Sequence, residues 1–269
     1  MCFYPCEDAP VEIRGARIVV TGASRGIGAA LATSLAASGA KVVLVARSRE
    51  AIEKRASELD GEAYTADLAQ GSKLERLVRE IEAVGPIDVL VNNAGVDLTG
   101  SLHELAAEDI EQLVAVNLTA PMLLCRAALP GMWKRGRGHI VNVSSLAGTN
   151  ALPGVAPYSA SKAGLSHFTA ALRAECKGTP VTTTLAEIGP VDSTMMDALR
   201  SHEPTRRAFE RLSALKLTVD LDMHDVVASL VEAIRTEKRH VRMPARDVMF
   251  PMLVEAPRRI TEFLLAGVK

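Results

Sequence analysis

Short apolar runs alternate along the chain with stretches that have the apolar spacing of amphipathic helices. The runs that predict buried strands are residues 18–20, 42–45, 63–66, 89–91, 140–143, 181–185 and 240–243. Helical spacing is expected near residues 27–35, 51–59, 74–81 and 108–133, and from Tyr158 onward. Pro121 is a predicted kink or boundary. This alternation favours an α/β fold, a Rossmann-like doubly wound parallel sheet with helices on both faces.

No internal repeat or low-complexity linker interrupts the pattern, so the 269 residues are expected to form a single domain. Its predicted parts are a cofactor half over about 15–145, a catalytic helix and substrate-covering segment over about 145–220, and a C-terminal helix, strand and variable tail over 221–269.

Composition narrows the class of protein. Hydrophobic residues make up 48% of the chain but aromatic ones only 3%, so aliphatic side chains must build the core. A net charge of -1 does not favour a nucleic-acid surface. The cysteines have no metal-binding or redox spacing, no histidine pairs with a second ligand at metal spacing, and no signal peptide or membrane-spanning run is found. We expect a reduced, cytoplasmic protein without a metal.

The glycines at 22, 26 and 28 follow the first predicted strand and open the first helix. A turn without side chains lets a diphosphate approach the N–H groups of a helix N-terminus. The spacing differs from the general dinucleotide fingerprint, and an ordinary glycine-rich turn is the alternative reading.

Tyr158 and Lys162 are an i,i+4 pair if their segment is helical. A nearby ammonium favours a phenolate, so Lys162 is predicted to lower the pKa of Tyr158 into a range useful for acid-base catalysis. Such pairs also occur on ordinary solvated helix faces.

Five motifs occur in a characteristic order: the glycine turn from Thr21 to Gly28, the segment from Asn92 to Gly95, then Asn117, Ser145 and the Tyr158–Lys162 pair. Ser145 stands thirteen residues before Tyr158 and twenty-eight after Asn117. Over about residues 17–194 the chain resembles the short-chain dehydrogenase/reductase family, of the compact single-domain kind. The resemblance implies a nicotinamide-dependent oxidoreductase.

The resemblance also implies which residues hold the cofactor. They are Thr21, Gly22, Ser24, Arg25, Gly26, Ile27, Gly28, Arg47, Asp67, Leu68, Asn93, Ala94, Gly95, Tyr158, Lys162, Gly189, Val191 and Ser193. Ala46 stands where an acid would select NAD(H), and Arg25 and Arg47 suit a 2′-phosphate, so NADP(H) is the preferred cofactor and NAD(H) the other option. The alternative for Arg25 and Arg47 is that both side chains are simply solvated. The alternative for Asn93 is that its side chain only stabilises the turn after the fourth predicted strand.

The family pattern assigns four catalytic roles. Tyr158 is the proton donor, and its phenolate the base in the oxidative direction. Lys162 lowers the tyrosine pKa and binds the nicotinamide ribose, Ser145 stabilises the substrate oxygen, and Asn117 holds a water that leads to Lys162. A turn-capping Ser145 and an Asn117 bonded to local backbone are the alternatives. Ser144 competes with Ser145, whereas Ser159 and Ser161 are expected to face away.

One stretch departs from the family pattern. After the sixth predicted strand the family usually shows Pro-Gly, but Ile188 to Val191 read Ile-Gly-Pro-Val, an arrangement also found in members that act on steroid-like or lipid carbonyls. The cofactor contact of this backbone is therefore in question. Ser193 matches the hydroxyl that binds the carboxamide, with Thr194 as the fallback.

An apolar stripe lies in the segment that covers the substrate in this family. It comprises Met195, Met196, Leu199, Phe209, Leu212 and Leu215. It suits either a hydrophobic ligand or a packed helix pair. Residues 243–269 suit a lid, a subunit contact, a peripheral membrane helix or internal packing.

Together these features predict an NADP(H)-dependent enzyme that interconverts a ketone or aldehyde with an alcohol, on a medium or large hydrophobic small molecule of lipid- or steroid-like character. The alternatives are the same site acting on another bond, such as an enoyl double bond, and a non-catalytic nucleotide sensor. The family resemblance implies a homodimer or homotetramer through helices near residues 105–130 and 158–176.

Overall fold

The computed structural model describes residues 11–150, 152–191, 196, 199, 201–214 and 219–244, without the side chains of 212 and 213. Several predicted features lie outside these residues. They are Ser193, Thr194, Met195, Leu215, the side chain of Leu212, Cys2, Cys6 and the tail beyond 244.

Seven parallel strands form one sheet in the order β3-β2-β1-β4-β5-β6-β7. Their bounds are β1 Arg17–Thr21, β2 Lys41–Ala46, β3 Glu62–Thr65, β4 Val89–Asn92, β5 Gly138–Ser145, β6 Val181–Ile188 and β7 His240–Met243. Every residue of β1 and β4 is buried, because helices cover both faces. The sequence order reverses between β1 and β4, which places the switch point of the sheet beside the glycine turn.

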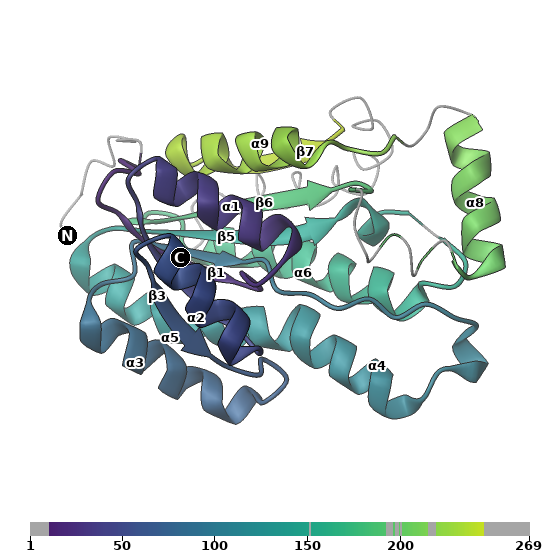
Figure 1. Cartoon of the computed structure of the whole chain (residues 1–269), viewed down its shortest axis with the longest axis horizontal. Helices are drawn as coiled ribbons and strands as arrows, with labels where there is room; N and C mark the ends of the chain where they lie inside the picture. The colour runs from purple at the N-terminus through teal and green to yellow at the C-terminus, as the bar shows by residue number, and fades with distance from the viewer. Residues whose placement is uncertain are drawn as a thin grey trace.

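Helices cover both faces of the sheet, and α8 (Glu203–Ala214) lies beyond its edge (Figure 1). Their bounds are α1 Gly26–Ala37, α2 Arg49–Glu58, α3 Leu74–Val84, α4 Ala107–Val114, α5 Ala120–Arg135, α6 Ala156–Glu175, α8 Glu203–Ala214 and α9 Met223–Arg235. Buried side chains of α1, α2 and α9 share one core cluster with the sheet, and those of α3, α5 and α6 share the other. The predicted doubly wound fold is confirmed.

The predicted break at Pro121 is confirmed in a specific form. The helical segment that starts at α4 passes through a π-helical turn, Ala115–Thr119, before α5 begins at Ala120. Pro121 is the second residue of α5, which directly follows the π-helical turn. The turn carries Asn117, whose side chain is fully buried. Single π-turns often occur at functional sites.

The continuous helical stretch Ala107–Arg135 is long and apolar enough to cross a membrane by length and composition alone. The stretch is not an uncharged run, because Arg126 lies within it. Half of its most apolar window is buried, and Leu124, Ala128 and Met132 pack in the core against the sheet. A helix packed in the core of a folded protein meets the same criteria of length and apolar composition.

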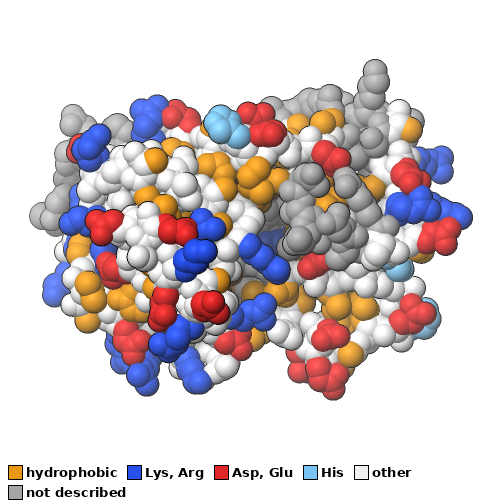
Figure 2. Space-filling model, viewed as in Figure 1, with side chains coloured by type: hydrophobic (Ala, Val, Ile, Leu, Met, Phe, Trp, Pro, Cys, Tyr) orange, Lys and Arg blue, Asp and Glu red, His pale blue; other side chains and the backbone are white. Residues whose placement is uncertain are grey.

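Charged side chains of both signs are interspersed on the face seen in Figure 2, without a continuous basic area. His139 lies in the core, where its ring nitrogens contact Thr182 Oγ1 at 2.7 Å and Thr184 Oγ1 at 3.0 Å. Burial lowers the pKa of His139 to about 4, so it is a neutral core residue at physiological pH.

Candidate functional site

A cavity of about 830 Å³ opens at the carboxyl ends of the strands. It brings together residues from the glycine turn, the ends of β2, β4, β5 and β6, and the start of α6. The predicted site residues that line it are Gly22, Ser24, Arg25, Gly26, Ile27, Arg47, Asp67, Leu68, Asn93, Ala94, Gly95, Ser145, Tyr158, Lys162, Gly189 and Val191. Thr21, Gly28 and Asn117 lie behind this wall.

The glycine turn is packed directly against the turn that follows β4. Gly22 has a φ of +69°, and a Cβ there would lie 2.8 Å from Ala94 Cα. A Cβ on Gly28 would overlap Asn93 Nδ2 and lie 2.5 Å from the Gly22 carbonyl oxygen. Glycine is required at both positions because backbone occupies the space of a side chain.

Gly28→Ala should destabilise the protein, since its methyl group must displace backbone rather than a flexible side chain. We expect a loss of about 1–3 kcal/mol in the free energy of unfolding, measured by denaturant titration. Gly85→Ala is the matched control, because its Cβ would meet Arg17 Cδ at an ordinary 3.5 Å. Equal stability of the two variants would contradict the packing argument.

Thr21 and Asn93 hold the two turns together. The Thr21 hydroxyl donates to Val91 O at 3.2 Å and accepts from the N–H groups of Asn93 at 3.0 Å and Ala94 at 3.1 Å. Asn93 Nδ2 donates to Thr21 O at 3.0 Å. Thr21 therefore shapes the cofactor end of the cavity from behind, whereas Asn93 both stabilises its turn and lines the cavity.

The start of α1 fits an anionic group. Arg25, the residue before the helix, makes no side-chain cap, and the first turn contains no acid. Gly26 has a φ of +57°, and a Cβ there would meet no protein atom within 4 Å. This combination of uncapped N–H groups and open space on a cavity wall suits a diphosphate.

Positive charge flanks the end of β2. Arg25 and Arg47 line the cavity, and neither pairs with an acid among the residues that the structure describes. Ala46, the last residue of β2, supplies no carboxylate there. Asp67 also lines the cavity, and its carboxylate accepts from Ala69 N and Gln70 Nε2, both at 3.1 Å.

Tyr158 and Lys162 stand one turn apart on α6, as predicted. The Lys162 ammonium lies 5.9 Å from the centre of the Tyr158 ring and donates to Val143 O at 3.0 Å. Ser145, at the end of β5, accepts from Ala147 N at 3.1 Å and also hydrogen-bonds Tyr158. The three side chains line one wall of the cavity.

The predicted lowering of the Tyr158 pKa by Lys162 is wrong for the protein alone. Burial raises the pKa of the Tyr158 phenol, the hydrogen bond with Ser145 lowers it, and the negative charge of Asp97 raises it again, for a net increase. Burial lowers the pKa of Lys162 itself to about 8. The desolvation of the phenol outweighs any effect of the ammonium, which is bound to a main-chain carbonyl.

Ser144 and Ser145 differ in their surroundings. The Ser144 hydroxyl donates to Lys162 O at 2.9 Å and contacts Ser166 Oγ at 2.9 Å, which ties β5 to α6. Ser145 is the serine that contacts Tyr158. Ser159 and Ser161 do not line the cavity, as predicted.

Asn117 uses both ends of its amide on one residue. Its Oδ1 accepts from Val96 N and its Nδ2 donates to Val96 O, both at 2.8 Å, and Nδ2 also reaches Ser161 Oγ at 3.2 Å. This clamp fixes the loop after β4. A Cβ on Gly95 would lie 3.4 Å from Asn117 Oδ1 and 3.5 Å from Lys162 Nζ, so both groups face the side of Gly95 that carries no side chain.

The backbone that departs from the family pattern still borders the cavity. Ile188, Gly189, Pro190 and Val191 all line it. Gly189 N donates to Met243 O at 2.8 Å, and Pro190 O accepts from Leu221 N at 2.7 Å. The end of β6 is thus held by main-chain contacts that do not depend on a Pro-Gly pair.

The far end of the cavity is apolar. Met196 and Leu199 form a small buried cluster with Val155, against which Phe209 and the ring of Tyr158 pack. Met196, Leu199 and Phe209 also line the cavity. These described members of the predicted apolar stripe therefore contribute both to internal packing and to the cavity wall.

Three segments at this end are connected in series. Gly100 N donates to Gly154 O at 2.9 Å. The Thr205 hydroxyl, on α8, donates to Pro153 O at 2.9 Å and contacts His202 Nδ1 at 2.8 Å. The loop after β4, the loop before α6 and α8 are therefore joined through main-chain oxygens.

Sequence reasoning missed Asp97, which lines the cavity near Tyr158. Its only signal was an acid placed two residues after Gly95, directly after the turn that follows β4. Sequence reasoning also missed Asn150, which lies in the wall contributed by the loop before α6.

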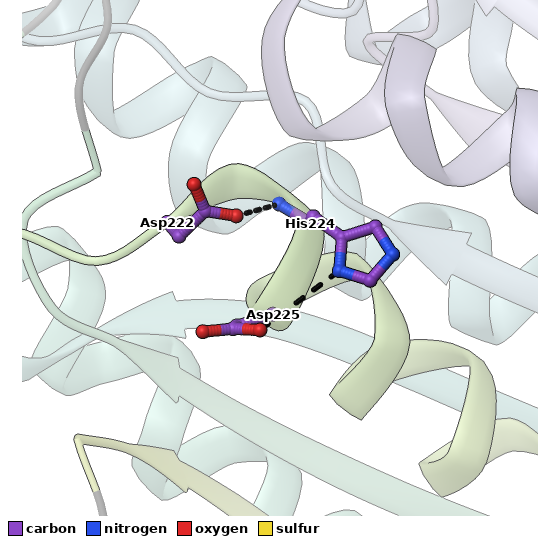
Figure 3. A group of neighbouring side chains, drawn as sticks. All are labelled: Asp222, His224 and Asp225. Atoms are coloured by element: carbon purple, nitrogen blue, oxygen red, sulfur yellow. Dashed lines mark hydrogen bonds and ion pairs between the residues drawn. The ribbon is translucent and has the colours of Figure 1, made fainter.

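The prediction that no histidine pairs with another ligand fails at His224. The ligand atoms of Asp222, His224 and Asp225 lie within 4.8 Å of one another (Figure 3). All three are exposed, and Asp222 Oδ1 accepts from His224 N at 2.7 Å as the cap of α9. Helix capping accounts for this group. Asp222 caps the start of α9, and His224 and Asp225 follow in the first turn of that helix.

The sequence pattern of the family described as short chain dehydrogenase matches residues 16–204. The chain belongs to the short-chain dehydrogenase/reductase family. It is an NAD(P)-dependent oxidoreductase that acts on CH–OH and C=O groups.

Individual members of the short-chain dehydrogenase/reductase family resemble the chain over most of its length. A ketoacyl reductase of Nostoc sp., HetN, is 36% identical over 235 residues, which are 85% of this chain and 78% of that protein. A solved metagenomic short-chain oxidoreductase in complex with NADP is 33% identical with a TM-score of 0.69, covering 86% of this chain and 96% of that one. A Beutenbergia cavernae protein described as a putative NAD(P)-dependent gluconate 5-dehydrogenase, solved with NADP bound at low occupancy, is 29% identical with a TM-score of 0.77, covering 87% of this chain and 96% of that one.

Proposed function

We propose that the protein reduces a ketone or aldehyde to an alcohol, or catalyses the reverse, with Tyr158 as general acid and base. The observation that carries this proposal is the convergence of Ser145, Tyr158 and Lys162 on one wall of a cavity whose other end presents an uncapped helix N-terminus. A phenol, a hydroxyl and an ammonium at one wall suit proton transfer to a developing alkoxide.

Within this proposal each side chain has one task. Bound nicotinamide cofactor supplies or accepts the hydride. Ser145 donates a hydrogen bond to the substrate oxygen, and Tyr158 transfers its phenolic proton to that oxygen as negative charge develops. The raised pKa of the buried phenol keeps the proton on Tyr158 until the alkoxide forms. Lys162 orients the cofactor ribose.

Asn117 is proposed to act mainly through the loop that it clamps. Both polar ends of its amide are engaged by Val96. A proton path from Lys162 through a water beside Asn117 remains part of the proposal. The side-chain oxygen of Asn117, Oδ1, faces the same side of Gly95 as Lys162 Nζ.

We propose that the cofactor is NADP(H), with NAD(H) accepted less well. The uncapped start of α1 would bind the diphosphate, and Arg25 and Arg47 would bind the 2′-phosphate. Two solved relatives, the metagenomic oxidoreductase and the gluconate 5-dehydrogenase, contain NADP. The proposed contacts include the remaining predicted cofactor residues, Ser193 among them.

The apolar wall formed by Met196, Leu199 and Phe209 supports a medium-sized hydrophobic substrate. A cytoplasmic homodimer or homotetramer, joined through the helices near 105–130 and 158–176, completes the proposal. Sedimentation velocity of the full chain tests the assembly, and a monomer at micromolar concentration would contradict it.

The decisive experiment follows NADPH consumption by the purified chain over ketones and aldehydes graded from small polar compounds to long-chain and steroid ones. We expect turnover that rises with apolar size. Enoyl compounds added to the panel test the alternative: NADPH consumption with these compounds alone would mean that the enzyme reduces a carbon–carbon double bond. NADPH binding without turnover of any compound would favour a nucleotide sensor.

A further inference from the structure

Charged side chains lie at both ends of the cavity, and the end near Tyr158 holds the Lys162 ammonium as well as Asp97. Arg25 and Arg47 stand at the cofactor end, whereas Asp97 stands near Tyr158 at the other. Of the two acids in the described lining, Asp67 has its carboxylate occupied by Ala69 N and Gln70 Nε2. Asp97 has no hydrogen bond or ion pair with any residue that the structure describes.

The main chain beside Asp97 is held in place. The preceding residue, Val96, has its N–H and its carbonyl both bound by the Asn117 amide at 2.8 Å. Three residues further on, Gly100 N donates to Gly154 O at 2.9 Å. A carboxylate on a loop fixed at both ends is preorganised, so little conformational entropy is lost when a ligand binds to it.

The surroundings make this carboxylate selective. The cavity that Asp97 lines also carries apolar side chains, namely Leu146, Leu152, Met196, Leu199 and Phe209. A carboxylate in such a cavity, without a donor among the described residues, gains most from a hydroxyl or an ammonium group. A second carboxylate placed there is repelled across a medium of reduced dielectric constant.

We propose that Asp97 selects the substrate: it accepts a hydrogen bond from a hydroxyl or ammonium group next to the reacting carbonyl and rejects substrates with a carboxylate at that place. This inference rests on the proposed carbonyl reduction and names the substrate class of the same site. The substrate is then an apolar ketone or aldehyde with a neutral or cationic donor near its carbonyl, rather than a keto acid.

The test compares kcat/KM for four ketones on one carbon frame that differ in a single group near the carbonyl: methyl, hydroxyl, ammonium or carboxylate. Wild type should prefer the ammonium and hydroxyl ketones to the carboxylate by about tenfold or more. Asp97→Asn should lower the ammonium-to-carboxylate ratio by about tenfold, with each kcat/KM taken relative to that of the methyl ketone in the same variant. Asp97→Glu should keep the order of preference.

The control is Asp109→Asn, which removes one negative charge from the exposed face of α4 and should leave all ratios unchanged. A second readout is the pH profile of alcohol oxidation. Among described residues, the charged groups that face Tyr158 are Lys162 on its own helix and Asp97 on the loop after β4, beside the neutral Ser145 of β5. Loss of the Asp97 charge removes one cause of the raised Tyr158 pKa, so the profile should shift to lower pH.

The possible outcomes separate the two proposals. No turnover of any ketone by wild type, with NADPH bound, overturns the carbonyl reduction on which this inference rests. Turnover with the same substrate ratios in Asp97→Asn and wild type overturns the role of Asp97 and leaves the reaction standing. An equal loss of rate on all four ketones would also overturn it, because that would be a structural effect.

Discussion

Tyr158→Phe is expected to lower the kcat of carbonyl reduction by about 10²–10⁴-fold, the contribution typical of a positioned general acid. The change removes one hydroxyl and keeps the ring, which packs against the cluster of Val155, Met196 and Leu199. The fold should therefore be retained, and the loss belongs to the chemical step. Steady-state NADPH oxidation with the best ketone of the panel measures it.

Two controls make the Tyr158 result specific. NADPH binding, followed by fluorescence titration, should change little in Tyr158→Phe, since the start of α1 and both arginines are untouched. Ser159→Ala is the matched variant on the same helix: its buried hydroxyl has no partner among described residues and does not line the cavity. Normal turnover by Tyr158→Phe would sink the assignment.

The double variant Arg25→Ala/Arg47→Ala should lose about a hundredfold or more of its preference for NADPH over NADH. Each arginine would make charge-assisted hydrogen bonds to a 2′-phosphate, worth about 1.5–3 kcal/mol. NADH lacks that phosphate, so its KM should change only slightly. The ratio of kcat/KM for the two cofactors, at constant ionic strength, is the measurement.

Arg49→Ala/Arg126→Ala is the matched control for this charge removal, because both arginines are exposed and lie outside the cavity wall. Its cofactor ratio should equal that of wild type. Equal kcat/KM of wild type for NADPH and NADH would contradict the role of Arg25 and Arg47 before any variant is made.

Local patterns were sufficient to predict the framework. The valine-rich runs of β1, β2 and β4 are continuous because both faces of the sheet are covered, and such runs are readable from sequence. The short β7 was predicted with its observed bounds, 240–243. The i,i+4 relation of Tyr158 and Lys162 followed from helix geometry alone.

Properties that depend on tertiary surroundings were not predictable in this way. The direction of the Tyr158 pKa shift is set by burial and by Asp97, which approaches from another element of the fold. The engagement of Asn117 depends on a π-turn that brings its amide to Val96. Sequence spacing reports neither solvent exposure nor contacts between residues distant in the chain.

The serial connection of Gly100, Gly154, Pro153 and Thr205 has a consequence for protein engineering. A loop transplanted from a relative with another substrate would place its main-chain N–H and carbonyl groups at other positions, and an α8 without a hydroxyl at residue 205 would lack the donor to Pro153 O. Chimeras that exchange the loop after β4, the loop before α6 and α8 together should stay folded more often than those that exchange one. Substrate range in this scaffold is then altered in blocks of three segments rather than one residue at a time.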